Sequence, residues 1–499
     1  MAMAFATDAN AGGWRFTPNV GASATYTDNA NQSANNPQDA LILSVTPGFS
    51  LQSEGLRRVQ ASVNYGLSGT ARFGETNTTD LYHNLGAVGK AELIDDFLFL
   101  EGTASISQAL ISLVGSPADA TTNDANRATV GVYSLSPSIQ KRLGTFATAQ
   151  ARFTTGGAIF GDNAASDSTN NAFTAGLNSG PRFNDLSWGV DYSIRKANNS
   201  GAVRNSTFER ASVTLGYALT RKFRVFGTYG EEWNEFLSAS NTSGSSYSVG
   251  AAWSPTRRTS IEGSVGERYF GRTYSFSGSH QARASNWTVR YSEDVSDISQ
   301  QFLQDSGRIF WVCGNQLFET PDFNPPPGQS GCTGPLTGAQ VTLALNTLGV
   351  PLSDLIALGF VNTALANGVF VIKTFNAGVS WSRGRLGWGI SIFDTKRIYQ
   401  NISEAEDRTQ GVTGTADYRL TPRTSANSSL SLTRNSASAT LLGAPAREDD
   451  LLSLSLGLNH QFGKDLSGAL TFRHQQRDSN AVNSDYTENS LTASGNLRF

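Results

Sequence analysis

The sequence predicts an all-β protein, a single transmembrane antiparallel β-barrel of about 22 strands, within a range of about 20 to 24. Three observations predict this fold. Apolar and polar residues alternate along most of the chain, as they do on strands with one apolar and one polar face. Short turns and long polar loops alternate as connections. The chain also ends in an alternating stretch, LTASGNLRF, whose last residue is aromatic.

The chain opens with a tail, residues 1–13, that precedes the first alternating stretch. Its sequence, MAMAFATDANAGG, contains small residues of the kind found at export-signal cleavage sites. We therefore expect either a signal remnant or a periplasmic extension there. No N-terminal plug domain is expected, and residues 14–499 are assigned to one barrel.

Alternation is clearest near the C-terminus, in LLSLSLGLNHQF (451–462). Every second residue from Leu452 to Leu458 is leucine, whereas Ser453, Ser455 and Asn459 share the other face. VQASVNYGLSG (59–69) repeats the pattern. Because barrel strands hide half their residues in the lumen, the absence of a long apolar run does not exclude a membrane protein.

The connections suggest which way the barrel is oriented. About ten short and often basic turns, such as KRLG (141–144) and SPTRR (254–258), alternate with about eleven longer loops rich in Asn, Ser and Asp. Short turns are typical of the periplasmic side and long loops of the extracellular side. Tryptophans near expected strand ends suit a membrane interface. The strands of a soluble β-sandwich or β-helix also alternate apolar and polar residues. Such a fold requires neither short turns at one end and long loops at the other nor tryptophans near its strand ends.

One segment, residues 301–369, breaks the alternation and is expected to be a large extracellular loop. Its first part reads as irregular, and its second part as two short helices interrupted near Pro351. Cys313 and Cys332 are expected to form a disulfide, which implies an oxidising compartment. Two interpretations stay open: a cap that stiffens the rim, or a gate that narrows the pore.

The polar face of the strands predicts the chemistry of the lumen. Hydroxyl- and amide-bearing side chains suit water, sugars and polysaccharide, although any water-filled lumen has this character. Charges of both signs argue against strong ion selection. The charged lumen candidates are Arg152, Asp191, Arg195, Glu262, Arg290, Asp417, Arg419 and Arg473.

Other functions find little support. No nucleophile elbow, phosphate loop or metal-spaced histidine cluster is visible, so we expect no enzyme, no metal and no cofactor. The net charge of −3 without a basic patch argues against nucleic acid. Leu491, Leu497 and Phe499 are expected to form a C-terminal signal for the barrel-assembly machinery, in a protein surrounded by outer-membrane lipid.

Three stretches of the chain carry a family resemblance: WRFTPNVGASATYTDNANQS, VTPGFSLQSEGLRRVQASVNYGL and NWTVRYSEDVSD. They resemble the outer-membrane barrel proteins of the PEP-CTERM/exosortase system. The resemblance implies the outer membrane of a Gram-negative bacterium and a link to exopolysaccharide production, with exopolysaccharide and periplasmic export proteins as partners. We therefore expect a conduit for exopolysaccharide. The alternatives are a general diffusion porin and a non-conducting surface scaffold or receptor.

Overall fold

The computed structural model describes most of the chain. The described residues are 9–11, 13–56, 58–75, 77–111, 126–161, 165–200, 204–238, 240–313, 316–320, 323, 332–337, 368–400, 405–438 and 446–499. The second half of the expected loop, including the predicted helices around Pro351, lies outside these residues.

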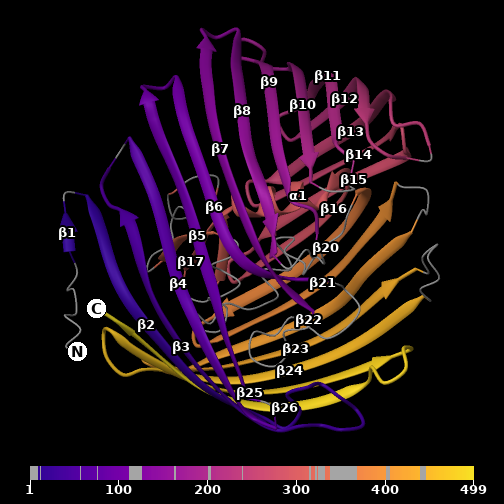
Figure 1. Cartoon of the computed structure of the whole chain (residues 1–499). Coiled ribbons are helices and arrows are strands. Elements are labelled where there is room, and N and C mark those ends of the chain that lie inside the picture. The colour runs from indigo at the N-terminus through magenta and orange to yellow at the C-terminus, as the bar shows by residue number, and fades with distance from the viewer. Residues whose placement is uncertain are drawn as a thin grey trace.

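Twenty-two antiparallel strands form one closed ring, which confirms the predicted fold class and strand number. Figure 1 shows the ring, with a helix inside it. The ring strands are β2 (Trp14–Thr27), β3 (Ala40–Ser53), β4 (Val59–Gly74), β5 (Thr78–Ile94), β6 (Leu98–Leu110), β7 (Arg127–Leu143), β8 (Ala147–Phe160), β9 (Ser168–Ser179), β10 (Leu186–Asn199), β11 (Ser206–Thr220), β12 (Phe223–Glu235), β13 (Gly244–Thr256), β14 (Thr259–Arg268), β15 (Gly271–Gln281), β16 (Ser285–Asp297), β20 (Val369–Arg383), β21 (Leu386–Tyr399), β22 (Glu406–Thr421), β23 (Thr424–Ala437), β24 (Arg447–Gln461), β25 (Leu466–Ser479) and β26 (Tyr486–Arg498).

The ring closes where β26 pairs with β2. The pairing runs from Asn19 opposite Arg498 to Thr27 opposite Ser490. The backbone N–H of Phe499 then donates to the carbonyl of Pro18 at 2.9 Å, so the final residue extends the seam. A three-residue strand, β1 (Ala9–Ala11), pairs with the start of β2. Closure leaves none of the ring strands with an unpaired edge.

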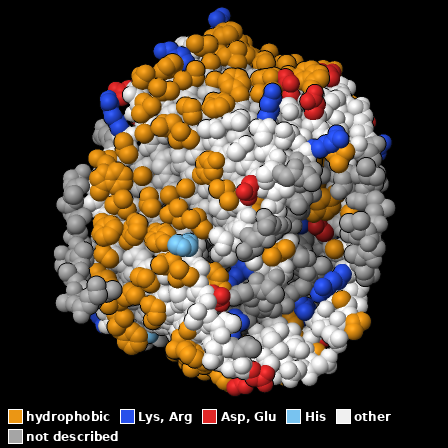
Figure 2. All heavy atoms as spheres, in the orientation of Figure 1, with side chains coloured by type: hydrophobic (Ala, Val, Ile, Leu, Met, Phe, Trp, Pro, Cys, Tyr) orange, Lys and Arg blue, Asp and Glu red, His pale blue; other side chains and the backbone are white. Residues whose placement is uncertain are grey.

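Alternation along the strands separates two faces of the wall. On β3, for example, Leu41, Leu43 and Val45 are exposed, whereas Ala40 and Ile42, which alternate with them, are buried. The exposed members of such pairs form the outer surface, and Figure 2 shows apolar side chains gathered over its upper and left parts. An apolar outer face with a polar inner face is the arrangement that a bilayer requires of a barrel.

Ten turns connect neighbouring strands at one end of the barrel, which we call the short-turn rim. Outward tryptophans lie close to these turns: Trp253, Trp287 and Trp388 are exposed, and Trp381 stacks on Trp388 with ring centroids 6.3 Å apart. Tryptophan is enriched where a membrane meets water. This end therefore carries an aromatic girdle, as the sequence suggested.

Between β16 and β20 lies the segment that breaks the alternation, and we call residues 298–368 the insert. Its described part is α1 (Ile298–Ser306) followed by a small sheet of β17 (Ile309–Cys313), β18 (Gln316–Thr320) and β19 (Cys332–Thr337). The expectation of irregular structure at the start of this segment was wrong. Strands of five or six residues are too short to show a clear alternating pattern, although Phe310, Trp311 and Leu317 are buried between them.

Candidate functional site: an insert docked in the barrel lumen

The insert leaves the rim opposite the short turns and enters the barrel. Figure 1 places α1 within the ring of strands, and α1 contacts β6, β7, β8 and β9. The side chains that it covers belong to the inner face, because Tyr133 and Ile159, which alternate with them, are exposed on the outer face. The large loop predicted on the extracellular side therefore turns inward over its described length.

An apolar patch on the inner wall receives α1. We call it the docking patch, and its members are Ala109, Ala128, Val130, Val132, Ala158 and Phe160. Ile298, Phe302 and Leu303 of α1 pack against it, and the rings of Phe302 and Phe160 meet edge to face with centroids 6.0 Å apart. Apolar side chains on the inner face of a water-filled barrel are unfavourable unless something covers them. The packing of α1 against the docking patch therefore removes these apolar side chains from water.

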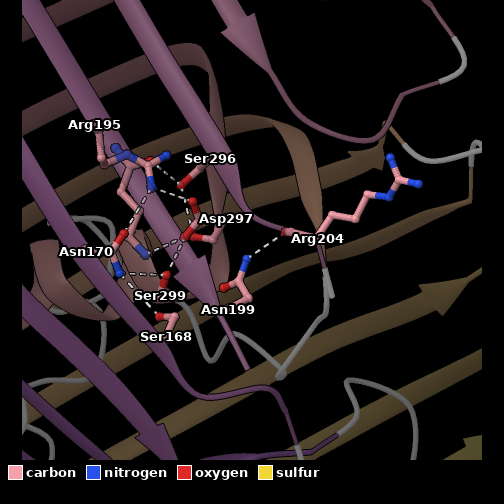
Figure 3. Close-up of polar contacts among 9 residues, drawn as sticks. Ser168, Asn170, Arg195, Asn199, Arg204, Ser296, Asp297 and Ser299 are labelled. Carbon is pink, nitrogen blue, oxygen red and sulfur yellow. Dashed lines mark hydrogen bonds and ion pairs between the residues drawn. The ribbon is translucent and has the colours of Figure 1, made fainter. Parts of the chain in front are cut away.

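Polar contacts, which we call the latch, fix the start of α1 (Figure 3). One carboxylate oxygen of Asp297 accepts from the backbone N–H of Gln300 at 2.9 Å and from the Ser299 hydroxyl at 2.6 Å, which makes Asp297 the N-cap of the helix. The other oxygen lies 2.5 Å from Nη1 of Arg195 on β10. Asn170 on β9 donates to the Ser299 hydroxyl at 3.2 Å.

The latch is largely removed from water. The side chains of Arg195 and Asp297 are 14% and 11% exposed, and the Arg195 guanidinium lies 4.2 Å from the centre of the Phe208 ring. A buried ion pair is costly to break on one side only, because the remaining charge is left in a poorly hydrated site. The latch therefore favours one position of α1 strongly.

A second charged network lies beside the root of the insert, on β12, β14 and β16. Arg268 contacts both oxygens of Glu232, at 2.7 and 3.1 Å, and reaches Asp294 at 2.9 Å. The side chain of Glu232 is only 2% exposed. One strand separates each of these strands from the next, so the network ties the wall together across five strands at the height where the chain turns inward.

The small sheet of the insert also touches the wall. The hydroxyl of Ser62 on β4 donates to the carbonyl of Pro335 on β19 at 3.1 Å. Within the sheet, Arg308 forms a bidentate pair with Glu319, at 2.9 and 2.8 Å. These contacts extend the covered inner wall from β9 to β4.

One carboxyl of the insert has a perturbed pKa. Burial inside the barrel raises the pKa of Asp305 to about 6, and the nearby Glu319 adds to this effect. Arg308, whose Nη1 lies 3.5 Å from Asp305, opposes it. The side chain keeps 43% exposure, so water inside the lumen screens part of the effect.

The charged lumen candidates lie on the inner face by strand register, but they do not form one site. Arg195 belongs to the latch. Three of the others have ionic neighbours: Arg152 with Glu101 at 2.5 Å, Glu262 with Arg224 at 3.6 Å, and Arg473 with Glu488 at 3.4 Å. Asp191 lies beside Gly176 on the neighbouring strand. Arg290 and Arg419 are exposed in the lumen, and Asp417 lies beside Gly387.

Two other expectations concern the cysteines and the C-terminus. The register of β17 and β19 places Cys313 directly opposite Cys332, and their disulfide stays a prediction. Leu491 pairs with Tyr26 and Leu497 with Val20 in the closing seam. Among the described residues no cluster of His, Cys, Asp or Glu could hold a metal ion, and no helix is long and apolar enough to cross a membrane.

Sequence reasoning missed the docking patch and the latch. A signal for the patch existed, because RATVGVYS (127–134) has Val130 and Val132 on the face that is polar elsewhere. The sequence contains no comparable signal for the latch, because Arg195 and Asp297 are 102 residues apart and each resembles an ordinary charged residue of the lumen.

Comparisons with known proteins support the fold. No family model matches the chain, and no curated protein matches it by sequence. The FrpB iron transporter from Neisseria meningitidis (F5-1 variant) is 10% identical, with a TM-score of 0.53 over 97% of this chain and 82% of that chain. The siderophore receptor PirA from Acinetobacter baumannii is also 10% identical, with a TM-score of 0.48 over 97% and 80%. The likeness to FrpB shows a shared barrel fold and nothing about activity.

Proposed function

We propose that this chain is an outer-membrane channel whose lumen is narrowed by its own insert, and that its cargo is exopolysaccharide. The observation that carries the proposal is the insert docked on the inner wall. A chain segment that packs inside the lumen through a buried ion pair and an apolar patch occupies space that a cargo would need, and in this proposal its release widens the pore.

The channel part of the proposal rests on the architecture. A ring of 22 strands encloses a lumen too wide to be filled by wall side chains alone. Much of the inner wall away from the docking patch is polar; on β24, for example, it carries Ser453, Ser455 and Asn459. Hydroxyl and amide groups exchange hydrogen bonds with a hydrated polymer at little net cost.

The choice of exopolysaccharide as the cargo rests on two observations, the chemistry of the inner wall and a sequence resemblance. The neutral character of the wall suits polysaccharide, and the resemblance of three sequence stretches to the PEP-CTERM/exosortase barrels favours exopolysaccharide over small solutes. The competing function is a diffusion porin, for which the same wall is equally suitable. We favour a regulated conduit, in which release of the insert opens the lumen to a polymer.

Single-channel conductance in planar bilayers tests the channel. We compare the intact protein with a variant in which residues 299–367 are replaced by a short Gly/Ser turn, which keeps both strand ends. Low conductance in the intact protein and large conductance in the variant are expected. Silence in both would overturn the channel and leave the scaffold; equal large conductance would reduce the insert to a rim brace.

The cargo is tested separately. Neutral glucans of increasing length, added to the open variant, should block current in a length-dependent way if a polymer threads the lumen. In the producing bacterium, loss of the gene should leave polysaccharide in the periplasm. Normal secretion with reduced uptake of small solutes would favour the porin instead.

A further inference from the structure

We propose that the outer wall of β10–β14 binds an anionic phospholipid, with an acyl chain in an apolar groove and its phosphate beside the basic turns above that groove. The inference rests on the membrane-spanning barrel of the proposed function. It does not depend on whether the channel conducts, so its test is independent of the conductance experiment.

The groove lies on the outer wall, close to the short-turn rim. It has a volume of about 680 Å³, within the range of about 300–1,000 Å³ that is usual for ligand pockets. Its outward lining is apolar and comes mainly from Leu215, Tyr217, Val225, Val249, Ala251 and Val265. Leu215, Tyr217, Val249 and Val265 are all more than two-fifths exposed, so the groove opens toward the surrounding lipid.

Two glycines keep the groove open. Gly227 and Gly263 point outward between larger neighbours and line the groove. A Cβ at Gly227 would meet only the Ser248 carbonyl, at 3.8 Å, and one at Gly263 would meet nothing nearer than 3.6 Å. The packing of the wall therefore tolerates larger residues at both positions. Their absence leaves space that a lipid chain can fill.

The two turns directly above the groove are basic. Arg221 and Lys222 form the turn between β11 and β12, and Arg257 and Arg258 form the turn between β13 and β14. All four side chains are exposed, and none forms an ion pair with a residue that the structure describes. The turns are joined, because the N–H of Ser254 donates to the carbonyl of Lys222 at 2.8 Å.

No acidic residue lies in either turn. The adjacent turn, between β9 and β10, contains Asp185 together with Arg182, and its Asp185 carbonyl accepts from the Ala218 N–H at 2.7 Å. The rim above the groove thus keeps four positive charges close together. Such a concentration attracts an anionic headgroup, and each basic residue adds to the attraction.

Trp253 lies at an intermediate height. It pairs in register with Phe223 and Ile261, nearer to the turns than the groove residues on the same strands, and is 48% exposed. Indole rings favour the level between acyl chains and headgroups. Groove, tryptophan and basic turns therefore follow the order of acyl chain, glycerol region and phosphate in a phospholipid.

A second outer groove, on β21–β26, offers an internal comparison. It is smaller, about 450 Å³, and the nearby turns carry Arg385, Arg423, and Lys464 next to Asp465. The positive charges there are more widely spread, and one is offset by a carboxylate. This arc provides the matched control.

Native mass spectrometry of the detergent-solubilised barrel tests the site, with phosphatidylglycerol and phosphatidylcholine of identical chains as probes. The wild type should retain phosphatidylglycerol preferentially. Arg221→Gln/Lys222→Gln and Arg257→Gln/Arg258→Gln should each reduce that preference about tenfold. Arg423→Gln/Lys464→Gln, which also removes two charges, should leave it nearly unchanged. Gly227→Leu should weaken retention of both lipids.

Each contrary result is decisive. Equal retention of the two lipids by the wild type, or an equal loss in the control pair, would overturn the specific site. Tighter retention of lipid A than of phosphatidylglycerol would also overturn it, because the phosphate would then come from the outer leaflet and this rim would face the opposite way. Heat-modifiable gel mobility of every variant verifies that the barrel is folded.

Discussion

Two parts of the inner wall differ in polarity. On β24, Ser453 and Ser455 face the lumen while the alternating leucines face outward. On β7, Val130 and Val132 face inward and are 0% and 4% exposed, because α1 covers them. The difference teaches that a run of apolar residues on the inner face of a barrel strand, as at Val130 and Val132, is a docking surface rather than a lipid-facing anomaly. The predictions below test that distinction, in order of decreasing effect.

The largest effect is expected from charging the docking patch. Val130→Asp with Val132→Asp should release the insert, because even an uncharged polar group without a hydrogen-bond partner costs about 2–7 kcal/mol in an apolar site, and an ionised carboxyl costs more. Single-channel conductance should approach that of the protein without the insert. The matched change on the polar wall, Ser453→Asp with Ser455→Asp, should leave conductance low. Equal opening by both pairs would show that the two walls do not differ.

Breaking the latch should come next. Asp297→Ala removes the N-cap of α1 and leaves Arg195 buried without its carboxylate, which costs about 3–5 kcal/mol for a buried pair. The open probability of the channel should rise steeply. Arg434→Ala breaks the half-exposed pair with Asp450 on the outer face and should leave the open probability nearly unchanged, because water screens the pair. A similar response to both changes would mean that the latch is not buried in solution.

A smaller effect is expected where the sheet of the insert meets β4. Ser62→Ala removes the hydroxyl that donates to the Pro335 carbonyl, which should cost about 1 kcal/mol. Backbone amides of β17 and β19 should then exchange hydrogen about fivefold faster. Thr25→Ala, which removes a hydroxyl pair with Thr492 at the seam, serves as the control and should not alter exchange in the insert.

The smallest effect should be a dependence on pH. The pKa of Asp305 is raised to about 6 in the docked insert, so the docked state binds a proton more readily than the released state. Docking should therefore strengthen as the pH falls from 7 toward 5, and conductance should decline over that range. Asp305→Asn should flatten the response. An opposite slope in the wild type, or an unchanged slope in the variant, would refute this assignment.

Sequence reasoning succeeded where structure follows from a local pattern. In strands such as β24 and β26, the alternation of apolar and polar residues predicts which side chains point outward and which point inward. The spacing of the basic turns predicts the number of strands. The inward path of the insert could not be read in this way. It depends on Arg195 meeting Asp297, and Ser62 meeting Pro335, across distances in sequence that no periodicity spans. The short strands β17–β19 were missed because their pairing is fixed mainly by contacts within the insert.

The seam between β2 and β26 has a kinetic consequence. It joins Asn19 to Arg498 and Thr27 to Ser490, so the last contacts of the ring link residues separated by nearly the whole chain. Forming them requires the largest loop closure in the molecule, and contacts of this kind form late and slowly. Until then the growing sheet exposes two long edges that can pair with any other strand. The interval before closure is therefore the period of greatest risk of aggregation, and a factor that shields those edges would govern the yield of finished barrels.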